Sequence, residues 1–109
     1  MLPKINRLTK EKDFEAVFKH GKSAKSGFLA VRVLKNNLPE SRFGFVVSKK
    51  ISTKATVRNK IKRRMRDAVV VQLKIINPPA DVVVLTMPSV ADKTFLEIKK
   101  AIETCLNSL

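Results

Sequence analysis

The sequence predicts an α+β (α/β sandwich) fold in which one small central sheet packs with three helices. A chain of 109 residues has the length of one domain, so we assign residues 1–109 to a single domain. Hydrophobic residues make up 44% of the chain, which favours a folded core over a disordered tail. Apolar patterns predict the order helix, two or three strands, helix, strand, helix.

The first predicted helix follows an irregular N-terminal arm and covers residues 9–20. Thr9 is expected to cap its start, and Gly21 is a typical residue at a helix end. Phe14 and Phe18 lie four residues apart, so we expect them to share one face of this helix.

The strands are predicted from runs of β-forming residues. Residues 22–27 are polar and basic, which is typical of a loop or a short edge strand. Residues 28–34 and 42–48 read as strands, and the short turn between them favours an antiparallel pair. Residues 81–87 form a continuous apolar run, as expected of a strand that is buried on both faces.

Two further helices are predicted on either side of this buried strand. One covers residues 57–76 and is ended by Pro78. The other runs to about Asn107, and Ser89 and Asp92 stand in capping-box spacing near its start. Its expected buried face consists of Phe95, Ile98, Ile102, Cys105 and Leu106.

Charge is the strongest bulk property of the chain. Lys and Arg number 23 and Asp and Glu number 9, which gives a net charge of +14. This charge favours a polyanionic partner, with nucleic acid first and an anionic membrane surface second. The chain has no apolar run of about 18 residues, and its single cysteine excludes an internal disulfide and a Cys-built metal site. We therefore expect a cytoplasmic protein.

Half of one predicted helix and the link before it are strongly basic. Nine cations fall in this segment: Lys49, Lys50, Lys54, Arg58, Lys60, Lys62, Arg63, Arg64 and Arg66. On a helix Arg58, Lys62 and Arg66 form a row at i, i+4 and i+8, with Asn59 beside it. The apolar stripe of the same helix consists of Val57, Ile61, Met65 and Ala68. Because ordinary solvated faces alternate in charge, this face predicts a polyanion but hardly separates RNA from DNA.

These segments resemble the protein subunit of bacterial ribonuclease P. The run F-G-F-V-V-S-K-K (43–50), followed by V-R-N-K-I-K-R-R-M-R-D (57–67), is similar to the strand and the "R-N-R" helix of that family. The run L-T-K-E-K-D-F-E-A-V-F-K-H-G-K (8–22) resembles its opening helix. Lys60 stands where the signature has Arg. The resemblance implies a left-handed strand–helix–strand crossover, where general rules predict a right-handed one.

The resemblance also implies a division of labour between protein and RNA. A large catalytic RNA, which requires Mg²⁺, removes the 5′ leader of precursor tRNA, and the protein contacts both RNA molecules. The residues expected to face the catalytic RNA are Lys49, Lys50, Lys54, Arg58, Asn59, Lys60, Lys62, Arg63 and Arg66. Phe14, Phe18 and Val31 are expected to line a cleft for the leader. No catalytic residue or metal ligand is assigned to this chain.

Other interpretations of these residues stay open at this point. Core packing is what most Phe pairs on a helix do, so it competes with leader binding for Phe14 and Phe18. His20 has no evident catalytic partner and reads as a helix-end residue. A small ribosomal or other structural RNA-binding protein, without a role in cleavage, is the alternative function. A DNA-compacting protein is a weaker one.

Overall fold

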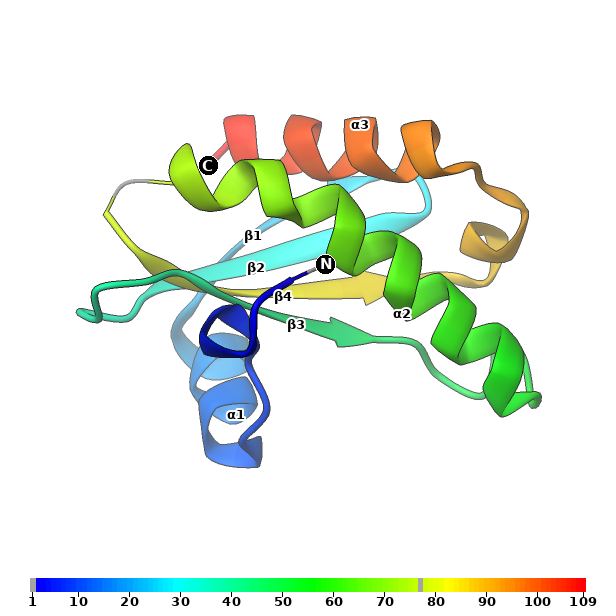
Figure 1. Cartoon of the computed structure of the whole chain (residues 1–109), viewed down its shortest axis with the longest axis horizontal. Helices are drawn as coiled ribbons and strands as arrows, with labels where there is room; N and C mark the ends of the chain where they lie inside the picture. Colours follow the sequence, from blue (N-terminus) through cyan, green and yellow to red (C-terminus); the bar gives the residue numbers. More distant parts are fainter. Residues whose placement is uncertain (1, 77) are drawn as a thin grey trace.

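The computed structural model of the protein describes residues 2–76 and 78–109. These residues form three α-helices and one four-stranded sheet, so the predicted α+β sandwich is confirmed. The helices are α1 (Glu11–His20), α2 (Ala55–Val69) and α3 (Phe95–Asn107). The strands are β1 (Lys22–Ser26), β2 (Leu29–Lys35), β3 (Arg42–Val46) and β4 (Ala80–Thr86). Three short 3₁₀ turns are η1 (Lys4–Asn6), η2 (Val70–Lys74) and η3 (Pro88–Asp92). Helices α2 and α3 cover one face of the sheet and α1 covers the other (Figure 1).

The strand order in the sheet is β1-β2-β4-β3. β4 pairs antiparallel with β2 and parallel with β3, so the antiparallel pair predicted between residues 28–34 and 42–48 is wrong. β4 lies between these strands because both of its faces are apolar and helices cover each of them. Val82 and Val84 belong to the core on one side, and Val83 to the core on the other. The basic segment 22–27 supplies the edge strand β1.

β1 and β2 form an antiparallel hairpin. Its turn contains Gly27, whose φ of 55° lies in the left-handed region that glycine adopts without a steric penalty. The antiparallel hairpin is thus formed by β1 and β2, one strand earlier in the chain than the predicted pair.

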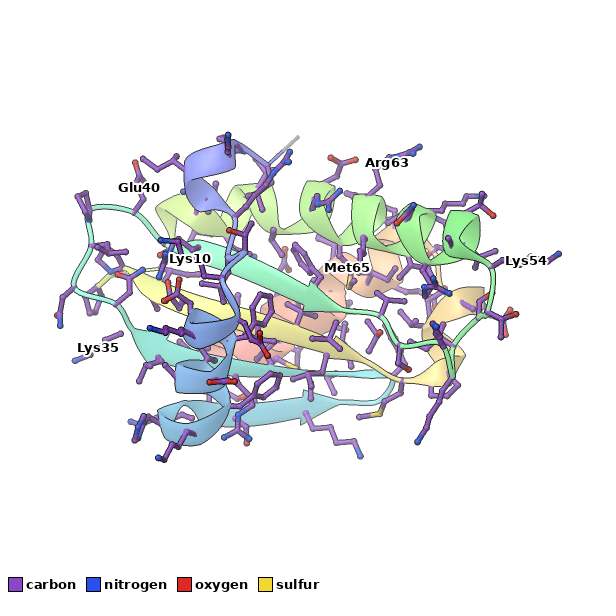
Figure 2. All side chains as sticks on the ribbon, turned by 90° about the horizontal axis from the view of Figure 1, so that it is seen from below. Lys10, Lys35, Glu40, Lys54, Arg63 and Met65 are labelled. Atoms are coloured by element: carbon purple, nitrogen blue, oxygen red, sulfur yellow. The ribbon has the colours of Figure 1, made fainter. Side chains whose placement is uncertain are left out.

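The chain crosses from β3 to β4 through α2. The two strands are parallel, and Figure 1 shows α2 above them, with β3 nearer to the viewer than β4. Figure 2, seen from below, agrees with this arrangement. The connection therefore turns in the left-handed sense. The family resemblance implied this hand, whereas the general preference for right-handed crossovers would have missed it.

The main core lies between the sheet and the helices α2 and α3. The predicted stripe of α2 is buried at Ile61, Met65 and Ala68, and Val57 packs at its margin. Figure 2 shows Met65 pointing inward and Arg63 pointing away. Full burial of a side chain such as Met65 contributes about 1.5–3 kcal/mol to folding. On the opposite face a smaller core joins Val17 of α1 to the sheet.

Cys105 belongs to the main core, as predicted. It is buried on α3 beside Ile102. Burial in these apolar surroundings raises the pKa of its thiol, so the thiol stays protonated and unreactive in the folded chain.

The helix boundaries correct several predictions. The N-cap of α1 is Lys10, which makes no side-chain cap, so the Thr9 cap is wrong. α2 begins at Ala55 and ends at Val69, and the remainder of the predicted helix tightens into η2. The tighter turn redirects the chain toward β4 before the proline pair.

The start of α3 also differs from the prediction. Ser89 and Asp92 lie in η3, and the capping box is formed instead by Thr94 and Glu97, with two hydrogen bonds of 3.2 Å. The Thr94 backbone amide, which donates to the Glu97 carboxylate, and the Thr94 side chain both lower the pKa of Glu97. Phe95 is 40% exposed and does not belong to the buried face of α3.

The N-terminal arm is anchored to the sheet rather than irregular throughout. Leu2 and Leu8 are buried, and the Leu8 amide donates a 2.8 Å hydrogen bond to the Phe43 carbonyl. The buried Asn6 side chain donates to the Ser41 carbonyl at 2.9 Å. The arm therefore covers the outer edge of β3, which would otherwise present unpaired backbone groups.

Candidate nucleic-acid interface

The predicted row of cations lies along one side of α2. Arg58, Lys62 and Arg66 are half-buried, because their aliphatic stems lie beside the apolar stripe while their charged ends reach water. Lys60 and Arg63, farther from the sheet, are exposed. The helix therefore presents a charged outer surface that is anchored through Ile61 and Met65.

The link before α2 extends this surface. Lys49, Lys50 and Lys54 are all exposed. A 3.1 Å hydrogen bond from the Ile51 amide to the Ser48 carbonyl closes a turn that carries the first two lysines. Figure 2 shows Lys54 at one end of α2 and Arg63 at its middle. The link and the helix thus form one basic surface, to which the exposed Asn59 also belongs.

Two arginines of α2 make hydrogen bonds within the protein. Arg58 donates from Nη1 to the Ser52 carbonyl at 2.9 Å, which holds the link against the helix. Arg64 donates from Nη1 to the Lys93 carbonyl at 3.3 Å and so faces the start of α3. The guanidinium of Arg58 keeps further N–H groups for an external anion, since arginine carries five.

A groove joins this basic surface to the aromatic face of α1. It encloses about 240 Å³, and its lining includes Arg7, Phe14, Gly44, Lys62 and Arg66. The sequence assigned Phe14 to one site and the α2 row to another. The structure brings them together because the left-handed crossover places α2 along the outer strand β3, and the Phe14 side chain of α1 reaches the same strand at Gly44.

Phe14 lies directly over Gly44 of β3. A Cβ atom at position 44 would overlap the edge of the Phe14 ring, so this close approach requires glycine. Phe14 is partly buried against Leu8, Val17 and Val83, with one side open to the groove. The ring therefore packs on the core and also lines a groove, while leader binding by Phe14 stays a prediction.

The Gly44→Ala substitution is expected to displace the Phe14 ring. Overpacking of this kind costs roughly 1–3 kcal/mol in the free energy of unfolding. We expect urea denaturation to show this loss, and RNA affinity of the folded variant to fall as well because the groove is deformed. A matched control is Gly27→Asn, at a turn remote from the groove. If Gly44→Ala leaves stability and affinity unchanged, the contact between ring and strand is not as described.

Phe18 is 38% exposed, one turn beyond Phe14 on α1. The backbone at this end of α1 is held by Arg32 of β2, whose guanidinium donates to the Phe18 carbonyl at 2.5 Å and to the Gly21 carbonyl at 3.4 Å. A cation at a helix C-terminus also opposes the negative end of the helix dipole. Arg32 therefore fixes the orientation of Phe18 relative to the sheet.

Arg42 of β3 holds the other end of α1. Its guanidinium contacts Asp13 at 3.3 Å and forms a bidentate pair with Asp81 of β4, at 2.6 and 2.8 Å. Asn36 donates a further 2.9 Å hydrogen bond to Asp81. The hydrogen bonds to Asp81 raise the pKa of Arg42. In the sequence, the signal for both residues is a cation within a run of β-forming residues, at Arg32 and at Arg42.

Val31 does not line the groove, which corrects the prediction. It is fully buried in the core beneath α2 and α3, on the face of the sheet opposite to α1. Side chains alternate along a strand, so the neighbours Ala30 and Arg32 face α1 instead. A residue one position before or after Val31 would have lain on the face of the sheet that carries α1.

The remaining candidates add no chemical group to this interface. His20 is exposed at the end of α1. Among residues 2–76 and 78–109, no three His, Cys, Asp or Glu side chains are grouped so that they could hold a metal ion. No helix within the described part of the chain is long and apolar enough to cross a bilayer.

Comparison with known proteins places this geometry in a family. The family model described as Ribonuclease P matches residues 2–109. The chain is 39% identical over 97 residues to the ribonuclease P protein component of Clostridioides difficile, covering 88% of this chain and 84% of that protein. It is 38% identical over 96 residues to the one from Rippkaea orientalis, covering 84% and 76%.

Solved structures agree with the sequence relatives. The RNase P protein of Staphylococcus aureus superimposes with a TM-score of 0.81 at 32% identity, covering 94% of this chain and 93% of that one. The RNase P protein of Thermotoga maritima gives a TM-score of 0.79 at 31% identity, covering 90% and 92%. The likeness extends over the sheet and all three helices.

Proposed function

The chain belongs to the bacterial ribonuclease P protein family, and on that premise we propose how it divides its surface between two RNA molecules. A member of this family is the accessory protein subunit of an endoribonuclease that processes tRNA 5′ ends, and its partner is an RNA. We propose that the basic surface of α2 and its link binds the catalytic RNA. The groove between α1, β3 and α2 receives the 5′ leader of precursor tRNA. Lys62 and Arg66 belong to both surfaces and therefore lie where the two RNA molecules meet in this proposal.

The groove shared by Phe14, Lys62 and Arg66 is the observation that carries this proposal. An aromatic ring beside cations is what a single strand requires, because bases stack on the ring while phosphates pair with the charges. Stacking tolerates any base, so leaders of different sequence are accepted alike. The half-buried stems of Lys62 and Arg66 limit the freedom of their charges, which reduces the entropy lost on binding.

The charges also suggest how the protein assists cleavage. Precursor tRNA and the catalytic RNA are both polyanions, so bringing them together requires cations. A chain of net charge +14 supplies fixed cations at the junction and lowers the concentration of Mg²⁺ that the RNA needs. The bond-breaking chemistry, with its Mg²⁺, belongs to the RNA in this proposal, and the location is the bacterial cytoplasm. The family match decides against the alternative of a ribosomal protein.

The Phe18→Ala variant tests whether the leader site extends along α1 beyond the groove, because Phe18 is exposed but is not among the residues that line the groove. Its affinity for precursor tRNA with a long leader is expected to fall roughly 5- to 100-fold, the loss of one stacked base, while its affinity for mature tRNA stays unchanged. Binding is measured with the reconstituted protein–RNA complex by fluorescence anisotropy. Phe95→Ala is the matched control, because Phe95 is equally exposed but lies on α3, at 40% against 38% for Phe18. Equal losses for both tRNA forms, or for both variants, would contradict a leader site at Phe18.

A further inference from the structure

A second cavity lies at the opposite edge of the sheet from the proposed groove. It encloses about 700 Å³, a size typical of small-ligand sites. It is bounded by β1 and β2, by η2 and by the last turn of α3. The cavity exists because α2 ends at Val69, before the sheet does, so the corner beneath α3 is covered only by the tighter turn η2.

The floor of this corner cavity is largely the face of the sheet that carries α2 and α3, and His20 and Leu34 from the α1 side also line the cavity. In the strand register Lys22 is opposite Val33, and Lys35 is opposite Ala80, so all four residues point to the side that carries α2 and α3. Lys22 and Lys35 are exposed, and they are diagonal neighbours on adjacent strands. Figure 2 shows Lys35 at the end of β2, away from the core. The apolar floor therefore ends at two positively charged lysines. No Asp or Glu is present among the described residues that line the cavity.

One wall of the corner cavity carries an unpartnered polar group. Gln72 is only 4% exposed and lines the cavity, and its side-chain amide makes no hydrogen bond with the described residues. No described side-chain nitrogen or oxygen is both fully enclosed and unpaired, so the Gln72 amide keeps a small contact with solvent, and Gln72 is one of the residues that line the cavity. A ligand that pairs with this amide replaces its restricted contact with water by a direct hydrogen bond.

We propose that the corner cavity binds a single nucleotide. The base lies against the apolar walls of Ile76 and Leu106, the Gln72 amide pairs with its hydrogen-bonding edge, and Lys22 and Lys35 hold the phosphate. A glutamine amide offers a donor and an acceptor side by side, the pattern that bases present on their edges. The corner cavity shares no lining residue with the groove at Phe14, so binding of a nucleotide here does not depend on the leader site.

The alternatives fit the same residues less well. A purely apolar ligand would leave the Gln72 amide unpaired and would gain nothing from Lys22 and Lys35. A second copy of this chain would bring another net charge of +14 against the same two lysines, which opposes association. A nucleotide satisfies the amide, the charges and the apolar walls together.

Nuclear magnetic resonance on the isotope-labelled full chain tests the proposal. Titration with each of the four nucleoside 5′-monophosphates is expected to give saturable shifts at Val33, Leu106 and the Gln72 side-chain amide. Inorganic phosphate alone should move only the lysine neighbourhood. A trinucleotide separates the two sources of a nucleotide: tighter binding of the trinucleotide assigns the site to an RNA strand, and tighter binding of a monophosphate to a free nucleotide.

Two variants and a control complete the test. Gln72→Leu keeps the volume, removes the unpaired amide, and is expected to weaken nucleotide binding roughly 3- to 10-fold without loss of stability. Lys35→Ala should weaken binding and reduce its salt dependence. Lys25→Ala, on β1 but opposite Ala30 and therefore facing the other side of the sheet, should change neither. The proposal is overturned if Gln72→Leu binds nucleotides like the parent chain, if phosphate reproduces every shift, or if only an acidic peptide or an apolar probe saturates the cavity.

Discussion

Replacement of Arg58, Lys62 and Arg66 together by alanine is expected to weaken binding of the chain to ribonuclease P RNA by roughly 100- to 1,000-fold at moderate salt. Each loss removes about one phosphate contact, worth about tenfold or somewhat less in affinity. The salt dependence reports the same contacts, since the slope of log K against log salt should flatten by roughly 0.7–0.9 for each of them. The measurement is a filter-binding or anisotropy titration at several salt concentrations.

A charge-matched control separates contact from net charge. Lys25, Lys99 and Lys100 lie on β1 and α3, away from the basic surface of α2. Their joint replacement by alanine removes the same three charges but should reduce affinity only slightly, through the weaker long-range field. If the two triple variants lose equal affinity, or if the slope of the α2 variant is unchanged, the α2 row does not contact phosphates.

The second large effect is expected at the Arg42–Asp81 pair. Arg42→Met leaves the Asp81 carboxylate, whose side chain is 8% exposed, without its cation. Among the described side chains, only that of Asn36 then donates a hydrogen bond to it. Breaking a buried pair in this way costs about 3–5 kcal/mol, and the partial exposure of Arg42 favours the lower end. Urea denaturation should therefore show a loss of about 3 kcal/mol in the free energy of unfolding.

Two controls define the origin of this loss. The double variant Arg42→Met with Asp81→Leu removes both charges and should recover much of the stability, because no charge is left buried. Lys93→Met removes one partner of the exposed Lys93–Glu97 pair, at 3.9 Å, and should cost less than about 1 kcal/mol. A double variant as unstable as Arg42→Met alone would mean that packing rather than charge is lost.

Arg42 matters for the proposed function as well as for stability. Through Asp13 it holds the start of α1, while Arg32 holds the end of the same helix. Phe14 and Phe18 project from the segment between these two contacts. We therefore expect folded Arg42 variants to bind long-leader substrates less tightly than the parent chain even where the basic surface of α2 is intact.

Periodicity in the sequence predicted the helices and most of their buried faces, although Phe95 is exposed and α2 ends at Val69. The stripe at Ile61, Met65 and Ala68 and the twice-buried strand β4 are local patterns, and local patterns determine which side of an element is apolar. The row at Arg58, Lys62 and Arg66 followed from the same helical spacing. These predictions needed no knowledge of which elements pack together.

Pairing between distant segments was not predictable in the same way. The insertion of β4 between β2 and β3 depends on competition for the centre of the sheet, which no short window contains. Val31 was assigned to the cleft from the family resemblance, whereas alternation along its strand places it on the face of the sheet opposite to Arg32. The anchoring of Leu2 and Asn6 likewise depends on the exposed edge of β3, 35 residues further along the chain in the case of Asn6.

The most direct test of the central claim is cleavage of precursor tRNA by the partner RNA with and without this chain, over a range of Mg²⁺ concentrations. We predict that the chain alone cleaves nothing. With the RNA it should restore cleavage at Mg²⁺ concentrations where the RNA alone is slow, and it should tighten binding of long-leader substrate. An unchanged Mg²⁺ requirement together with unchanged substrate affinity would contradict the account.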